Sequence, residues 1–336
     1  MMEEKSSGSP SRWSRLKSQR ANLALFTIGL VLIVLSPIWR FTIAPAVRIV
    51  ATDQDRISFY SGTLADYVRA PGQPPVGAQP AKRAITVQMR YSNPLGRSTS
   101  TIALLQGDNA LVDAVTRVHL SDVRHFYAID RQTALQVPDH GSDVNRAGTY
   151  YFIFPFNTPR TDLPVWDNLS ETTRKSTYVQ QETLSSIKTY LLSMRYAGQP
   201  VPAPPDFPSQ VTGAQLKAIA PPSVPAIGDT DTVRIAYKGN LTLDFVVEPI
   251  SGTQIGIRRQ QQSVYMSVED PARGLSFTQV IYTLDFAQQA ASFQEGVNFA
   301  KDEIAKIKLQ FLYLPAGYLV IGIACVLIGL FTTSKE

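Results

Sequence analysis

The sequence predicts a mainly β protein, an antiparallel barrel or sandwich ectodomain with some helix, flanked by two transmembrane α-helices. Two observations predict this fold. A long apolar segment lies near each end of the chain, and each is close to the ~20 residues that a helix needs to cross a bilayer. The chain between them contains many short runs of high strand propensity separated by turn residues, which is typical of antiparallel β domains.

The first apolar segment, residues 21–45, carries no charge from Leu23 to Trp39. It follows a basic tail, residues 1–20, of the kind that stays in the cytoplasm. A cleaved signal peptide is the alternative, because Ala44-Pro45-Ala46 resembles a small-residue cleavage site. The apolar run exceeds the about 7–15 residues of a signal core, and we therefore expect a transmembrane helix.

The second apolar segment, residues 309–331, leads into a short tail, residues 332–336. With two spans and a basic N-terminal flank, both tails should be cytoplasmic and residues 46–308 extracytoplasmic. Trp39 and Tyr318 should then lie at the outer interface. The one cysteine, Cys325, is inside the second span, so the ectodomain has no disulfide, which favours a bacterial plasma-membrane protein.

The ectodomain should be mostly strand. We expect strands at 84–91, 101–106, 111–119, 126–129, 150–154, 186–196, 232–237, 241–248, 254–258, 263–268 and 275–284. Proline-rich stretches at 70–82 and 199–227 are predicted loops, because proline lacks the donor of a ladder hydrogen bond. The second stretch could alternatively be a recognition segment for an aromatic groove.

A membrane-proximal helix is predicted over residues 286–308, where Phe293, Val297, Ala300 and Ile304 recur at helical spacing. This amphipathic face should pack on the sheet. The bilayer surface or a partner helix are the alternatives.

Asp130 and Glu248 share a local sequence pattern. Each ends an apolar strand, and a hydroxyl residue follows three positions later (Thr133 and Ser251). A carboxylate there can accept hydrogen bonds from the N–H groups of a turn. We predict that both are structural turn acceptors in β-hairpins. An internal duplication of half of the domain would also explain this repeated pattern.

The sequence carries no recognised catalytic, metal or nucleotide-binding motif, so we expect no enzyme, no catalytic residue and no cofactor. A metal site needs three or four converging ligands. The candidate ligands are His119 and His125 with Asp122 and Asp130. Surface or hydrogen-bonded histidines are the alternative, and we expect no metal. Asp167 and Asp244 each adjoin an aromatic residue. Either could be a carboxylate of raised pKa in a cleft, or an ordinary turn or surface residue.

Aromatic and branched residues are the best ligand-facing candidates, with close-packed core as the alternative. They are Tyr150, Phe152, Phe154, Phe156, Trp166, Ile235 and Phe245. The net charge of +5 lies partly in the N-terminal tail, and no basic stripe indicates nucleic-acid binding.

Four segments resemble the bacterial PorA-like family, also known as DUF3068, and the two apolar segments match as well. The four segments are Asp130-Arg131-Gln132-Thr133, Tyr150–Phe156, Pro164-Val165-Trp166-Asp167 and Val247–Gly252. Ala134 stands where that family often has glycine, and the proline-rich insert departs from the pattern. The resemblance implies a cell-envelope protein and no catalytic residue. The plan of two terminal spans around a β-rich ectodomain is also similar to that of the CD36 scavenger-receptor family, which carries lipids.

Two functions fit these observations. The first is a membrane-anchored carrier or binding protein for a lipid or other apolar envelope molecule, with an apolar cavity in the ectodomain. The second is a structural or accessory subunit of a membrane complex, partnered by another membrane protein or a second copy of itself, with an exposed apolar patch.

Overall fold

The computed structural model describes residues 12–51, 55–68, 82–93, 96–205, 207–219 and 227–333. Most of the N-terminal tail, the proline-rich stretch before Lys82 and residues 220–226 of the insert lie outside the described residues. The chain divides into two compact units. Met1–Ile49 with Ile304–Glu336 form the helical unit, and Val50–Glu303 form the β unit.

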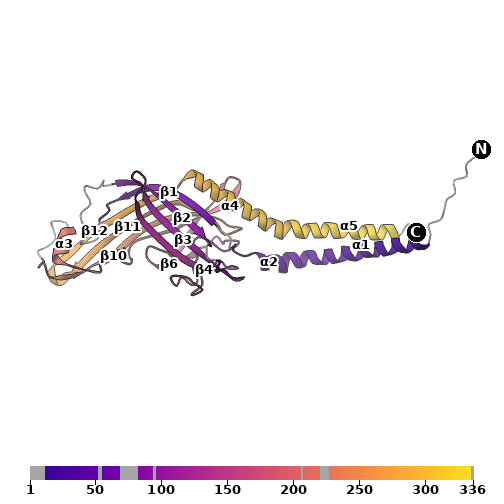
Figure 1. Cartoon of the computed structure of the whole chain (residues 1–336), viewed down its shortest axis with the longest axis horizontal. Helices are drawn as coiled ribbons and strands as arrows, with labels where there is room; N and C mark the ends of the chain where they lie inside the picture. The colour runs from indigo at the N-terminus through magenta and orange to yellow at the C-terminus, as the bar shows by residue number, and fades with distance from the viewer. Residues whose placement is uncertain are drawn as a thin grey trace, which may run out of the picture. The chain divides into compact units, whose positions relative to one another are not determined.

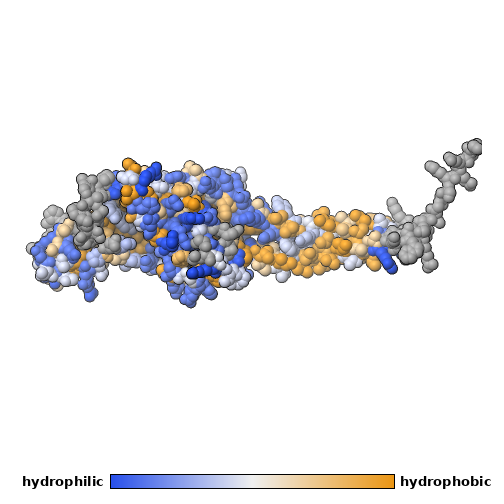
Figure 2. All heavy atoms as spheres, viewed as in Figure 1, coloured by the Kyte–Doolittle hydropathy of each residue, from blue (hydrophilic) through white to orange (hydrophobic). Residues whose placement is uncertain are grey.

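Two long helices run through the helical unit. One runs through α1 (Arg12–Ile38), the π-helical η1 (Trp39–Ile43) and α2 (Ala44–Val47). The other continues from α4 (Ala290–Lys308) through the π-helical η3 (Leu309–Tyr313) into α5 (Leu314–Thr333). Gln19–Val47 and Ala290–Thr332 are long and apolar enough to cross a membrane. α1 and α5 lie side by side, and their visible surface is largely hydrophobic (Figures 1 and 2).

The predicted interface residues Trp39 and Tyr318 lie at the same level of this helix pair. Their rings meet edge to face, with centroids 5.7 Å apart. The indole N–H of Trp39 donates to the carbonyl of Gln310 at 3.0 Å.

In the described part of the β unit, ten strands form one antiparallel sheet in the order β4-β3-β2-β1-β12-β11-β10-β7-β6-β5 (Figure 1). Their bounds are β1 Asp55–Ala65, β2 Lys82–Ser92, β3 Ile102–Asp113, β4 His119–Asp130, β5 Leu163–Asp167, β6 Thr172–Leu184, β7 Ile187–Pro200, β10 Ala236–Glu248, β11 Thr253–Asp270 and β12 Leu275–Gln288. The predicted mainly β fold between two apolar helices is confirmed.

The sheet is curled around its largest core. Side chains from β1, β2, β5, β7, β10, β11 and β12 share one buried cluster, which strands this far apart in a flat sheet could not form. The segment after β4 links the two edge strands. Gln136 bridges Ile129 of β4 and bonds to Thr149, and the next residue, Tyr150, bridges Val165 of β5.

Smaller elements complete the unit. β8 (Gln210–Thr212), α3 (Gly213–Ile219) and β9 (Thr232–Arg234) cover the far ends of β10–β12, where Leu216 and Met266 lie in a second buried cluster. The predicted amphipathic helix is α4, which begins at Ala290 because β12 runs on to Gln288. Its Val297 and Ala300 pack on Val246 and Ile255 of the sheet, as predicted.

Several strand predictions are wrong. Residues 150–154 make isolated bridges rather than a strand, because this segment crosses between the sheet edges. Residues 111–113 end β3 and His119 begins β4, so a turn at residues 114–118 interrupts the predicted strand 111–119. β1, β5 and β6 were not predicted. β6 is rich in charged and amide residues, and it is a strand because β7 pairs with it.

Candidate functional site on the concave face

The inner side of the curled sheet, which we call the concave face, is defined by strand register. Residues directly opposite one another on paired strands point to the same side of a sheet. Leu243 of β10 faces Gln260 of β11, which faces the buried Phe286 of β12. In the next row Gln262 lies between Leu241 and Leu284.

Apolar side chains on this face are incompletely buried. Leu111 (β3), Leu120 (β4), Tyr178 (β6), Leu243 (β10) and Tyr282 (β12) all pack against the main core and all retain exposed area. A close-packed interior would bury such side chains fully. Five strands therefore present apolar surface that is accessible from outside the unit.

Three polar side chains, Gln260, Gln262 and Tyr282, lie among the apolar side chains of the concave face, and we call them the polar strip. The side-chain amide of Gln260 donates to Gln262 Oε1 at 2.8 Å, and Gln262 Nε2 approaches the Tyr282 hydroxyl at 3.4 Å. Burial raises the pKa of Tyr282 to about 12, so its hydroxyl remains a neutral donor at physiological pH. Sequence reasoning missed these three residues. The available signal was that Gln260 and Gln262 are two residues apart on one strand, so their side chains lie on the same side of the sheet.

The structure brings together three of the predicted ligand residues, Tyr150, Phe154 and Phe245, and places the others apart from them. Phe154 stacks on Phe245 with ring centroids 5.3 Å apart and on Tyr150 at 6.0 Å, within the main core. Phe152 belongs to another cluster, where it stacks on Tyr91 at 4.1 Å. Ile235 lies in the cluster at the far ends of β10–β12.

Trp166 packs beside a buried arginine. The guanidinium of Arg146 lies 5.5 Å from the Trp166 ring and 4.6 Å from the Tyr127 ring. It donates to Asp143 at 2.5 Å, and Asp143 also contacts His125 at 2.7 Å. This cluster closes the core between β4 and β5. Phe156, the last predicted ligand residue, is only partly buried.

Acidic turn acceptors occur at four places in the sheet. Glu248 is fully buried and accepts from the backbone N–H groups of Ile250 and Ser251, at 2.9 and 2.8 Å, and from the Ser251 hydroxyl. Asp130 accepts from the N–H groups of Gln132 and Thr133. Both predicted turn acceptors therefore have the expected hydrogen bonds.

Asp113 and Asp167 repeat this acid-x-x-hydroxyl pattern in the β3–β4 and β5–β6 turns. Asp167, considered above as a cleft carboxylate, is a turn residue that also accepts from the Tyr196 hydroxyl at 2.7 Å. Because the acid-x-x-hydroxyl pattern occurs in four turns, it indicates a recurring turn motif rather than a duplication of half of the domain. Ala134, which stands where the resemblance expects glycine, has φ +63°, a left-handed conformation that favours glycine.

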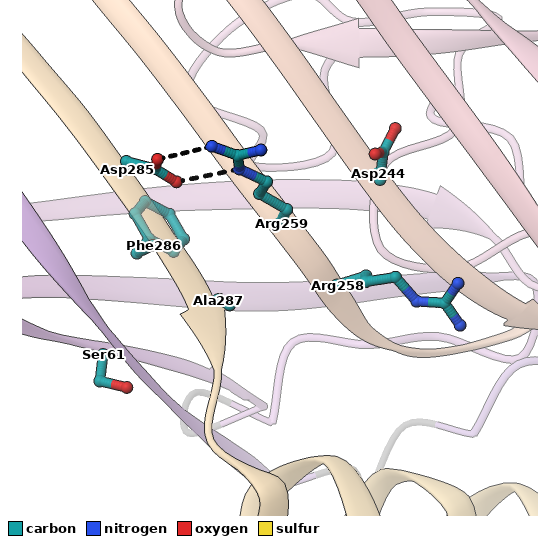
Figure 3. Close-up of a pocket in the computed structure, with 7 residues that line it drawn as sticks. All are labelled: Ser61, Asp244, Arg258, Arg259, Asp285, Phe286 and Ala287. Carbon is teal, nitrogen blue, oxygen red and sulfur yellow. Dashed lines mark hydrogen bonds and ion pairs between the residues drawn. The ribbon is translucent and has the colours of Figure 1, made fainter.

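A shallow pocket of about 410 Å³ lies over β1 and β10–β12, where Asp244 and Asp285 point outward from the sheet (Figure 3). Arg259 forms two bonds to Asp285, at 2.8 and 3.2 Å. Asp244 accepts from the Ser193 hydroxyl at 2.5 Å and pairs with Arg195 at 3.4 Å. Because its charges are paired with each other, this pocket is a weaker ligand site than the concave face.

Acid should weaken the neighbouring pair of Arg258 with Glu182. The Arg258 hydrogen bond holds the pKa of Glu182 below its ordinary value of 4.5. A carboxyl with a lowered folded-state pKa adds stability above its unfolded pKa, and this stability is lost as the pH falls through the folded value. We expect urea unfolding midpoints to fall below about pH 4.5, and less steeply in Glu182→Gln. Equal slopes in both proteins would contradict this assignment.

Within the described ranges no group of three His, Cys, Asp or Glu side chains could hold a metal ion. His119 and His125 both lie on β4, where they pair with Asp122 and Asp143 respectively. The two histidines do not converge on a common site.

Comparison with known protein families identifies a match. The family model described as Porin PorA aligns with residues 21–331, nearly the whole chain. The chain belongs to the PorA family. A search of the curated proteins finds no match. Membership of the PorA family and two candidate membrane helices identify a membrane protein of the cell envelope, and confirm the resemblance to PorA-like proteins.

Proposed function

We propose that this PorA-family chain is a non-enzymatic, membrane-anchored binding or carrier protein for a lipid or other apolar envelope molecule. The concave face is the proposed binding surface. The observation that carries the proposal is the accessible apolar surface contributed by Leu111, Leu120, Tyr178, Leu243 and Tyr282. Apolar surfaces with few polar groups are the usual form of a lipid site.

The outward face of the sheet supports binding rather than pore formation by the strands. A transmembrane barrel presents an outward apolar band to lipid. Here Asp244, Arg259 and Asp285 point outward from the middle of β10–β12 as ion pairs. Ion pairs of this kind fit a water-exposed surface, with the two apolar helices as the membrane anchors.

The proposed location is the bacterial plasma membrane, with both termini cytoplasmic and the β unit outside. The basic tail before the first span motivates this orientation. Protease added to intact spheroplasts should digest the β unit and spare an epitope placed before Arg12. Protection of the β unit would contradict the orientation.

Filling the concave face should displace bound lipid. Native mass spectrometry of the full chain in a mild detergent should detect co-purifying lipid. Leu243→Trp places a larger side chain on the concave face and should lower lipid occupancy by about tenfold, the effect of a loss of about 1.4 kcal/mol. Thr242→Trp is the control, because Thr242 is the preceding residue on β10 and points to the opposite side. Equal lipid in both variants and the wild type would contradict the proposal.

An accessory-subunit function is the second candidate, because three valines of the β3–β4 hairpin are exposed. Val115 is 80% exposed, Val118 57% and Val123 38%. Exposed apolar patches mark protein interaction sites, and Val115 and Val118 lie in the same turn. Photo-cross-linking from position 115 in native membranes would support this function by trapping a membrane protein or a second copy of the chain, and would count against it by trapping neither.

A further inference from the structure

We infer that the polar strip of Gln260, Gln262 and Tyr282 recognises an uncharged hydroxyl group carried part-way along the apolar chain of the ligand. This inference rests on the proposed function of the concave face and specifies the chemistry of its ligand.

The strip has unused hydrogen-bonding capacity. Within the described part of the chain, Gln260 Oε1 accepts no hydrogen bond and the hydroxyl proton of Tyr282 has no acceptor. The bond from Gln262 to Tyr282 is also long, at 3.4 Å. A ligand hydroxyl can supply both missing partners, because it donates one hydrogen bond and accepts others.

The surroundings of the strip favour an uncharged group. The residues paired with the two glutamines are all apolar: Leu241, Leu243, Leu284 and Phe286. An ionised carboxylate or phosphate placed among them would lose water without gaining a cation. Two amides and a neutral phenol offer donors and acceptors but no charge.

The position of the strip indicates where the group lies on the ligand. Partly exposed apolar side chains occur on both sides of it, Leu243 on β10 and Leu111 on β3. A ligand lying across these strands would contact apolar surface before and after the strip. The polar group therefore belongs within an apolar chain rather than at a charged end.

Two matched probes test the inference, methyl stearate and methyl 12-hydroxystearate, which differ by one hydroxyl. Binding of each to the full chain is measured in the same non-ionic detergent. The wild type should bind the hydroxylated ester about tenfold more tightly, which corresponds to one net hydrogen bond of about 1.4 kcal/mol. Gln262→Leu and Tyr282→Phe should each remove this preference and retain binding of methyl stearate.

Gln261→Leu is the control, because Gln261 lies on the same strand, is exposed and points away from the concave face. It should keep the preference. Equal binding of the two esters by the wild type, or a preference that survives in Gln262→Leu and Tyr282→Phe, would overturn the inference and leave the proposed function standing. Failure of the wild type to bind either ester would overturn both.

Discussion

Replacing Glu248 by alanine is expected to lower the free energy of unfolding by roughly 2–4 kcal/mol, because buried groups that lose their acceptor cost about 1–3 kcal/mol each. Two backbone N–H groups and the Ser251 hydroxyl depend on this carboxylate. Glu248 is 0% exposed, so water cannot replace it. The effect should spread, because the carbonyl of Gly252 in the same turn accepts from the N–H of Phe154 at 2.9 Å.

Asp130→Ala is the matched comparison. Its turn has the same hydrogen-bond pattern but is partly exposed, so water can satisfy the freed N–H groups. We expect a loss of about 0.5–2 kcal/mol, the range for removing a side-chain cap. Urea unfolding of both variants in detergent measures the difference. Equal losses would show that burial does not raise the cost, and a melting curve for Glu248→Ala like that of the wild type would show that the buried turn does not stabilise the fold.

Replacing Gly29 by leucine should separate the two membrane helices. A Cβ atom at Gly29 would lie 2.6 Å from the carbonyl oxygen of Gly322 and 2.8 Å from the backbone nitrogen of Val326. Small residues let membrane helices approach this closely. A larger side chain must push the backbones apart, at a cost of about 1–3 kcal/mol for overpacking.

Cross-linking between the helices measures this separation. Cysteines replacing Trp39 and Tyr318 in a Cys325→Ser background should be joined by a short bismaleimide, because these two side chains meet across the helix pair with ring centroids 5.7 Å apart. Gly29→Leu should strongly reduce the yield. Gly317→Leu is the control, since a Cβ there meets nothing within 4 Å. The same yield in both variants would contradict the close packing.

The sequence was sufficient for features that depend on local chemistry. Uncharged runs of helical length predicted both candidate membrane helices, and strand propensity predicted β2, β7 and β12 within a few residues and the second half of β10. The acid-x-x-hydroxyl pattern predicted two turns because the hydrogen bonds are made within four residues of chain. The same rule applied at Asp113 and Asp167 would have predicted the other two.

Features that depend on distant pairing were missed. The polar strand β6 is specified by its pairing with β7, and local composition does not show it. The aromatic run from Tyr150 to Phe156 has strand propensity, yet it crosses between sheet edges and fills the core. Gln260 and Gln262 look like surface residues in sequence. Only the register with Leu243 and Leu284 places them on the concave face.

Photo-cross-linking with a diazirine-labelled fatty acid tests the central claim most directly, because it reports where an apolar chain contacts the protein. The full chain in detergent is irradiated with the probe, and labelled residues are identified by peptide mass spectrometry. We predict labelling on the concave face, at Tyr178, Leu243 and Tyr282, that is lost in Leu243→Trp and kept in Thr242→Trp. Labelling confined to α1, α5 and the outward face of the sheet would contradict the account.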